Sequence, residues 1–154
     1  MKGLKIKDIS VKAKQGRYGI VYTSWNPSIV QDLLKETKKE LISQGVDETN
    51  IYLKEVPGAF ELPLATLFMA EKEGILSVIS LGAIIRGDTP HFDFISSSCL
   101  EGLQEVSLKT RIPVICGVLT TNTIGQAEER SDPNKMNKGK EFALTALNMV
   151  DSLS

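Results

Sequence analysis

Residues 76–85, Leu-Ser-Val-Ile-Ser-Leu-Gly-Ala-Ile-Ile, form a nearly unbroken run of apolar and small residues. A strand with one face in water alternates apolar and polar side chains, whereas a strand covered on both faces of a parallel sheet does not. The run is also far shorter than the roughly 18 apolar residues that a membrane-spanning helix needs. It therefore predicts the central strand of a parallel sheet with helices on both faces.

Strand and helix patterns alternate along the rest of the chain. Shorter apolar runs at residues 18–22, 51–56 and 114–119 predict three further strands. The segments between and after them predict helices, marked by turn or cap residues: Asn26-Pro27 and Gly45 for the first, Pro57-Gly58 and Gly74 for the second, His91 for the third, Thr123 and Gly139 for the last two. Four β-α units predict the α/β class, as a three-layer α/β/α sandwich with a four-stranded parallel sheet, flavodoxin-like in arrangement.

Length and charge narrow the classes of protein further. A chain of 154 residues has the usual size of one domain, and because it contains neither a repeat nor a long linker we expect residues 1–154 to form a single domain. Eighteen Lys and Arg residues against nineteen Asp and Glu residues leave a net charge of −1. Such a balance provides no general attraction for nucleic acid or anionic membranes, so neither is expected as a partner.

The two cysteines, Cys99 and Cys116, lie in apolar surroundings without the spacing of a metal site. They predict buried free thiols in a reducing compartment, with no metal bound. The first residues lack the apolar core of a secretion signal, so a cytoplasmic location is expected. The chain also lacks a Walker-type glycine loop and the G-x-S-x-G and H-E-x-x-H motifs, which argues against the common nucleotide, nucleophile and metal chemistries.

In a parallel α/β sheet, ligands bind beyond the carboxyl ends of the strands. Here those ends carry the loops at residues 24–26, 56–61, 86–91 and 120–123. His91 is the only histidine of the chain, and an unperturbed imidazole titrates at about 6.5, so it can exchange protons with a substrate near neutrality. The turn before it, Gly87-Asp88-Thr89, suits a phosphate because a helix N-terminus follows it. A plain turn and a structural histidine are the alternatives.

Other polar and aromatic residues have two interpretations each. Trp25 can stack on a heteroaromatic ligand or belong to the core. Glu61 can accept hydrogen bonds from ligand hydroxyls or complement a helix N-terminus. Arg130 and Lys138 can bind a phosphate, which the fork of an arginine suits better, or remain solvated charges.

Taken together, these motifs resemble those of the lumazine synthase family. The likeness extends from residue 19 to the terminal helix and includes ordered motifs at matching spacing, at residues 25–26, 56–63, 82–92, 113–120, 126–130 and 137–139. The resemblance implies a transferase of riboflavin biosynthesis. It would condense 5-amino-6-(D-ribitylamino)uracil with 3,4-dihydroxy-2-butanone 4-phosphate to 6,7-dimethyl-8-ribityllumazine, phosphate and water, without metal or organic cofactor.

The resemblance also implies a role for each site residue. His91 would move protons, Trp25 would stack on the pyrimidine ring, and Arg130 would pair with the phosphate. The remaining residues would hold the ring and the ribityl chain (Ala59, Phe60, Glu61), line the pocket (Ile84, Ile85, Cys116), border the phosphate site (Gly87, Asp88, Thr89) or support it (Lys138, Glu141).

In the family each site lies between neighbours of a homopentamer, so the resemblance implies self-association, with Arg130 and Lys138 facing a pocket built mainly by the adjacent copy. Pentamers, decamers and icosahedral capsids are all left open. The likeness further suggests that the segment around Ile9 to Ala13 joins a neighbour's sheet. Two residues depart from the usual pattern: Cys116 stands where many members have an aromatic residue, and Ser24 replaces a frequent arginine.

Two other functions share these motifs. A riboflavin synthase of the similar pentameric type would convert the lumazine alone to riboflavin. A noncatalytic flavin-binding or cage-forming protein would use Trp25 to bind a ligand and would not need His91. Supplying both substrates together, or the lumazine alone, distinguishes the three.

Overall fold

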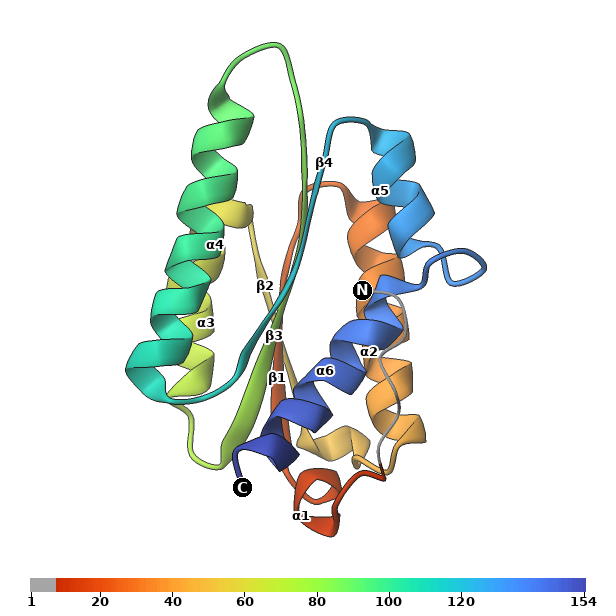
Figure 1. Ribbon diagram of the computed structural model, residues 1–154, viewed down its shortest axis with the longest axis vertical. Coiled ribbons are helices and arrows are strands. Elements are labelled where there is room, and N and C mark those ends of the chain that lie inside the picture. The colour runs from red at the N-terminus through yellow and green to blue at the C-terminus, as the bar shows by residue number, and fades with distance from the viewer. Residues whose placement is uncertain (1–7) are drawn as a thin grey trace.

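A computed structural model describes residues 8–154. Its centre is a sheet of four parallel strands in the order β2-β1-β3-β4 (Figure 1). The strands are β1 (Arg17–Thr23), β2 (Ile51–Val56), β3 (Ile75–Ile85) and β4 (Val114–Thr121). All four lie where the apolar runs predicted them, and the predicted parallel sheet is confirmed.

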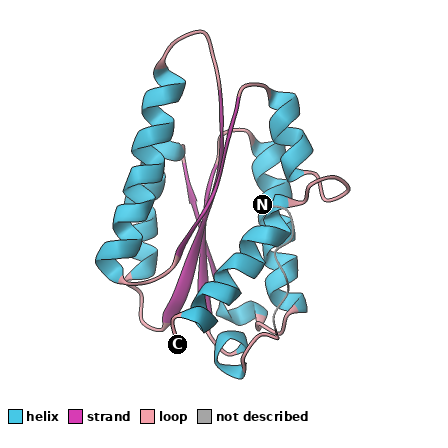
Figure 2. Ribbon diagram, viewed as in Figure 1, coloured by secondary structure: helices cyan, strands magenta, loops and turns pink. Residues whose placement is uncertain are grey.

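Helices cover both faces of this sheet (Figure 2). One face carries α2 (Pro27–Ser43), α5 (Ile124–Ser131) and α6 (Lys138–Ser152), and the other carries α3 (Leu62–Ala70) and α4 (His91–Thr110). Three short elements complete the order: α1 (Val11–Lys14) and the 3-10 turns η1 (Glu48–Asn50) and η2 (Ala59–Glu61). The three-layer α/β/α sandwich is therefore the observed architecture.

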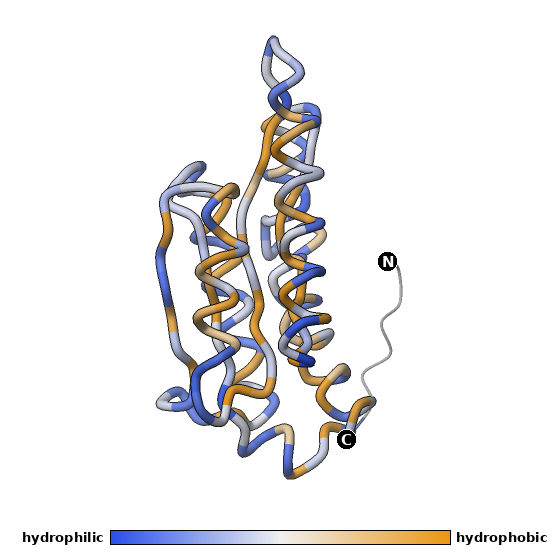
Figure 3. Tube along the Cα trace, turned by 90° about the vertical axis from the view of Figure 1, so that its left-hand side faces the viewer, coloured by the Kyte–Doolittle hydropathy of each residue, from blue (hydrophilic) through white to orange (hydrophobic). Residues whose placement is uncertain are grey.

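The hydrophobic core is divided by the sheet into two clusters. Tyr18, Leu33 and Leu147 belong to the cluster under α2 and α6, whereas Leu62 and Leu103 belong to the one under α3 and α4. Strand β3 is buried along nearly its whole length, as its continuous apolar run predicts. Along the tube of Figure 3, the helices alternate between hydrophobic and hydrophilic residues, as amphipathic helices do. Within residues 8–154, no helix combines the length and the apolar character needed to cross a membrane.

Helix α2 begins at Pro27 and ends just before Gly45, as the turn residues predict. Asn26, however, differs from an ordinary N-cap. It precedes Pro27 in a left-handed conformation with φ of 55°, and its side chain caps no helix amide. Its Nδ2 instead donates to the carbonyl oxygen of Ala83 at 3.0 Å. Asn26 thus ties the loop after β1 to the end of β3. At the other end of α2, Gly45 has a φ of +110° that favours glycine.

Cys116 departs from the prediction that both cysteines are buried. Cys99 is buried, and burial followed by the nearby Cys116 raises the pKa of its thiol to about 12. Cys116 is exposed. The reason is its position on β4, which is an edge strand of the sheet. A short apolar run in the sequence does not show whether a strand is central or at an edge.

The segment from Ile9 to Ala13, which the resemblance places against a neighbour's sheet, packs against its own chain in the single copy described. Residues from Val11 onward form the helix α1, whose cap Ser10 also hydrogen-bonds to Asp151 on α6, with its amide 3.0 Å from Oδ2. Tyr18 donates from its hydroxyl to the carbonyl oxygen of Ala13 at 2.8 Å. The segment therefore folds back on its own chain because local capping and a buried tyrosine hold it there.

Gly139 sets how closely α6 approaches α2. A Cβ at this position would lie 2.7 Å from the carbonyl oxygen of Leu33 and 3.0 Å from the Cβ of Glu36. Since backbone cannot yield easily, we expect Gly139→Ala to lower the free energy of unfolding by about 1–3 kcal/mol in urea denaturation. Gly125 is the matched control, because it is also the second residue of a helix and a Cβ there meets nothing closer than 3.9 Å. Equal stability of the two alanine variants would contradict this account.

Candidate active site

The strand order creates a crevice at one end of the sheet. From β1 the chain moves to one side to form β2 and then crosses to the other side to form β3. The carboxyl ends of β1 and β3 therefore flank a topological switch point, where α/β sheets bind ligands. A cleft of about 530 Å³ lies there. The predicted site residues that line it are Trp25, Ala59, Phe60, Glu61, Ile84, Ile85 and His91.

Two aromatic side chains on the cleft are exposed to solvent. Trp25 is 70% exposed and Phe60 67% exposed, which rules out the interpretation of Trp25 as a core residue. Their loops are joined, because the amide of Trp25 donates to the carbonyl oxygen of Pro57 at 3.3 Å. Exposed flat aromatic groups beside a cleft suit stacking on a heteroaromatic ring.

Glu61 lies close to Trp25 across the turn at Gly58. Its Oε2 accepts a hydrogen bond from the amide of Gly58 at 3.1 Å. A Cβ on Gly58 would lie 3.3 Å from this oxygen and 3.6 Å from Cδ1 of Trp25. The glycine thus lets an aromatic ring and a carboxylate approach the same point. Within residues 8–154 only Oε2 makes a hydrogen bond, which leaves Oε1 able to accept one from a ligand hydroxyl.

His91 is the first residue of α4 and borders the cleft from the side of β3. Its imidazole is exposed, and its amide donates to Oγ1 of Thr89 at 3.4 Å. Asp88 and Thr89 lie in the exposed turn before it but do not line the cleft. The turn thus places the amides at the N-terminus of a twenty-residue helix next to a titratable side chain.

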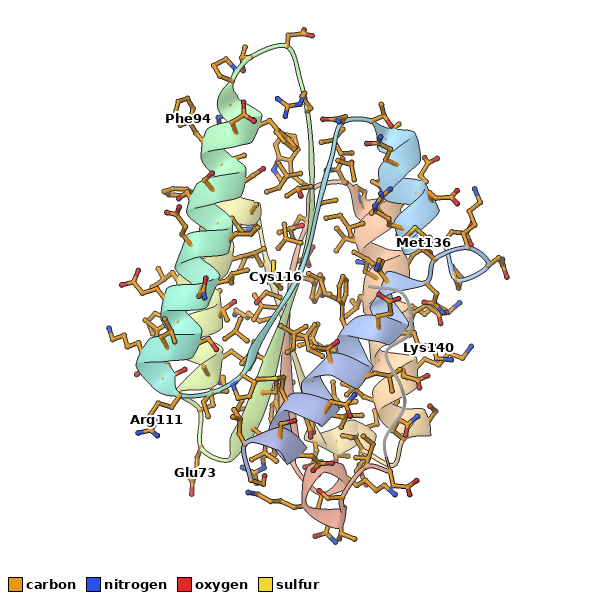
Figure 4. The ribbon with its side chains drawn as sticks, viewed as in Figure 1. Glu73, Phe94, Arg111, Cys116, Met136 and Lys140 are labelled. Atoms are coloured by element: carbon orange, nitrogen blue, oxygen red, sulfur yellow. The ribbon has the colours of Figure 1, made fainter. Side chains whose placement is uncertain are left out.

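Three other predicted site residues lie away from this cleft. Arg130, on α5, donates from Nη1 to the carbonyl oxygen of Gln126 at 2.9 Å, and Lys138, on α6, forms an ion pair with Glu141 at 2.7 Å. Cys116 lies midway along the sheet, as Figure 4 shows, and pairs with Ser80 well before the end of β4. A single copy of the chain therefore does not bring them to the cleft.

Sequence reasoning missed several cleft residues. Thr23, Asn26, Gly58, Ala83 and Ile95 also line it. Asn26 had a recognisable signal, because asparagine tolerates the left-handed conformation that a tight strand-to-helix turn requires. For the others, Thr23, Gly58, Ala83 and Ile95, the sequence carries no distinctive pattern. In the part of the chain that the structure describes, no group of three or more His, Cys, Asp or Glu side chains is placed to hold a metal ion.

A known protein family matches most of the chain. The family model described as 6,7-dimethyl-8-ribityllumazine synthase matches residues 15–154. The matched range includes all four strands, helices α2 to α6 and every residue that lines the cleft. It begins directly after α1. The chain belongs to the 6,7-dimethyl-8-ribityllumazine synthase family, whose members are transferase-type enzymes of riboflavin biosynthesis.

Proposed function

We propose that this protein condenses 5-amino-6-(D-ribitylamino)uracil with 3,4-dihydroxy-2-butanone 4-phosphate to give 6,7-dimethyl-8-ribityllumazine, phosphate and water. The observation that carries the proposal is the cleft at the switch point. It combines exposed aromatic rings, a carboxylate and the only histidine of the chain. An exposed aromatic surface and an imidazole beside one cleft supply both ring stacking and a group able to transfer protons.

Different residues of the cleft recognise different parts of the substrate. Trp25 stacks on the pyrimidine ring, and Glu61 accepts hydrogen bonds from the ribityl hydroxyls. Ile84 and Ile85, at the end of β3, form an apolar wall that keeps the ring away from water. Because neither Trp25 nor Phe60 needs to move out of a core, the binding surface exists before the ligand arrives.

The reaction needs proton transfer more than a strong nucleophile. The amino group adds to the ketone and a first water leaves to form an imine. Phosphate is then eliminated, and the resulting enol becomes a ketone. The ribitylamino nitrogen adds to this second carbonyl, and a second water leaves as the ring closes. Each addition and elimination moves a proton between nitrogen, carbon and oxygen atoms. His91 takes up and returns these protons, which a positioned imidazole does efficiently near neutrality. No metal or organic cofactor takes part.

The phosphate requires positive charge, and among residues 8–154 those that line the cleft of a single chain include no lysine or arginine. The exposed amides of the Gly87-Asp88-Thr89 turn border the site, but Arg130 and Lys138 lie on α5 and α6. We therefore propose that these cations serve the cleft of an adjacent copy in a ring. The phosphate of the butanone then lies between the two copies, so assembly is part of the mechanism.

An apolar groove supports this self-association. It measures about 1040 Å³ between β2 and α3, and among its lining residues Leu53, Leu64 and Phe68 are exposed. Large exposed apolar surfaces mark protein interfaces. The groove shares Phe60 and Glu61 with the cleft, so a copy that covered the groove would also reach the substrate.

The two-substrate assay tests the proposed reaction. Both substrates together should release phosphate and form a fluorescent lumazine, above the rate of a reaction without protein, and neither should do so alone. Riboflavin formed from the lumazine alone would point to the related synthase. Flavin binding with no condensation above background would overturn the proposed reaction in favour of a noncatalytic role.

A further inference from the structure

Arg86 lies at the end of β3 and contacts two other segments. Its amide donates to the carbonyl oxygen of Thr121 at 2.9 Å, and its Nε donates to Oδ1 of Asn122 at 2.9 Å. Its two terminal nitrogens donate to the carboxylate of Asp93 at 3.2 and 3.4 Å. The guanidinium carbon lies 4.3 Å from the centre of the Phe92 ring. One side chain thus joins the start of α4 to the loop after β4.

The contacts continue from that loop to Arg130. The amide of Asn122 donates to Oε1 of Gln126 at 2.8 Å, and Arg130 donates from Nη1 to the carbonyl oxygen of Gln126 at 2.9 Å. On the other side, Phe92 and Asp93 directly follow His91. Arg86 therefore contacts the two residues that directly follow the proposed proton-transfer residue, and it is linked through Asn122 and Gln126 to the proposed phosphate-binding residue.

The energetics favour a geometric role over a stabilising one. The Arg86 and Asp93 side chains are 42% and 59% exposed, and ion pairs at such exposure contribute roughly 0–1 kcal/mol to folding. The number of directed contacts is nevertheless high, because a guanidinium offers a rigid fork of donors and a flat face for stacking. Lysine keeps the charge but cannot make the bidentate contact, the Nε contact and the stacking at once.

We propose that Arg86 is a positioning residue that holds His91 and Arg130 in one fixed arrangement. This inference rests on the proposed function for the roles of those two residues. If Arg130 serves an adjacent copy, Arg86 links the proton-transfer part of one site to the phosphate-binding part of the next. A small displacement at either end then lowers activity, because catalysis depends on placement to within about an ångström.

Arg86→Lys tests the proposal kinetically. We expect kcat to fall about tenfold and KM for the phosphorylated substrate to rise about fivefold, with KM for the pyrimidine within about twofold of the wild-type value. Arg111→Lys is the matched control, because Arg111 is also exposed but lies at the opposite end of α4, as Figure 4 shows. Wild-type kinetics in Arg86→Lys would show that charge alone suffices and would overturn the proposal.

Two further variants separate the contacts of Arg86 on the His91 side from those on the Arg130 side. Asp93→Asn removes the carboxylate charge that pairs with Arg86 and should chiefly lower kcat. Asn122→Ala removes the hydrogen bond from Arg86 to Asn122, on the Arg130 side, and should chiefly raise KM for the phosphorylated substrate. Adding Asn122→Ala to Arg86→Lys should raise that KM no further, since Arg86→Lys has already removed the hydrogen bond to Asn122. Full additivity of the two changes would contradict a shared role.

Hydrogen exchange provides a readout that does not depend on activity. In Arg86→Lys, the backbone amides of residues 86–94 and of residues 121–131 should exchange faster together, while the melting temperature and the exchange of the rest of the sheet stay as in the wild type. A change confined to one segment, or to neither, would disprove the positioning role even if condensation is observed. Conversely, a wild-type protein without condensation activity would refute the proposed function, while the exchange data would still decide whether Arg86 joins the two segments.

Discussion

His91→Ala should lower kcat for lumazine formation about 10- to 1,000-fold. General acid–base groups contribute typically ~10²–10⁴, and the lower part of the expected range allows for the share of catalysis that comes from positioning the two substrates. Because His91 is exposed and its side chain makes no hydrogen bond within residues 8–154, its removal should leave the fold intact. The measurement is the steady-state rate of lumazine fluorescence with the spontaneous reaction subtracted.

Ser97→Ala is a matched control for this variant. Ser97 also lies exposed on α4, within two turns of His91, but does not line the cleft. It should keep wild-type rates. Unchanged kinetics in His91→Ala would remove His91 from the mechanism, and the proton transfers would then have to pass through water or the substrate phosphate.

Arg130→Ala should lower kcat/KM for the phosphorylated substrate by about 10- to 150-fold. This range corresponds to the loss of a charge-assisted hydrogen bond worth roughly 1.5–3 kcal/mol. Binding of the pyrimidine alone, measured by fluorescence quenching of Trp25, the only tryptophan, should not change. Lys135→Ala is the control, because Lys135 is a nearby cation whose ion pair with Glu129 is exposed. Equal damage to pyrimidine binding would contradict the assignment of Arg130 to the phosphate.

Mixing the two variants tests whether a site is shared between copies. In a closed ring with head-to-tail contacts, an equal mixture of His91→Ala and Arg130→Ala chains should form intact sites at about a quarter of the positions. Co-refolding the two should then restore activity well above that of either variant alone. If His91 and Arg130 act within a single copy, no mixed ring can contain an intact site, and activity should not return.

Much of the fold was predictable from local patterns. The continuous run at residues 76–85 marked a strand buried on both faces, and the structure has β3 at Ile75–Ile85. Strand β2 matches its prediction at both ends, and helix α2 begins at Pro27 and ends before Gly45. These elements were predictable because burial on one or two faces imposes a spacing on apolar residues, and because glycine and proline interrupt it for steric reasons.

The candidate site was predictable only in part. Parallel strands bring their carboxyl ends to one edge, so the loops carrying Trp25, Glu61 and His91 had to meet there, and they do. The exposure of Cys116 was not predictable, because the order of strands in a sheet depends on contacts between distant segments. For the same reason, the sequence could not predict the hydrogen bond from Asn26 to Ala83 or the contacts of Arg86 with Asp93 and Asn122.

The sequence by itself determined the class of fold, the family and the edge of the sheet where the cleft lies. These properties follow from periodicity, turn residues and ordered motifs, all of which are local in the chain. The tertiary structure alone decided that α1 folds back on α6, that Arg86 joins two loops, and that Arg130 and Lys138 lie outside the cleft of their own copy. Each of these depends on side chains that are distant in sequence and meet only after the layers have packed.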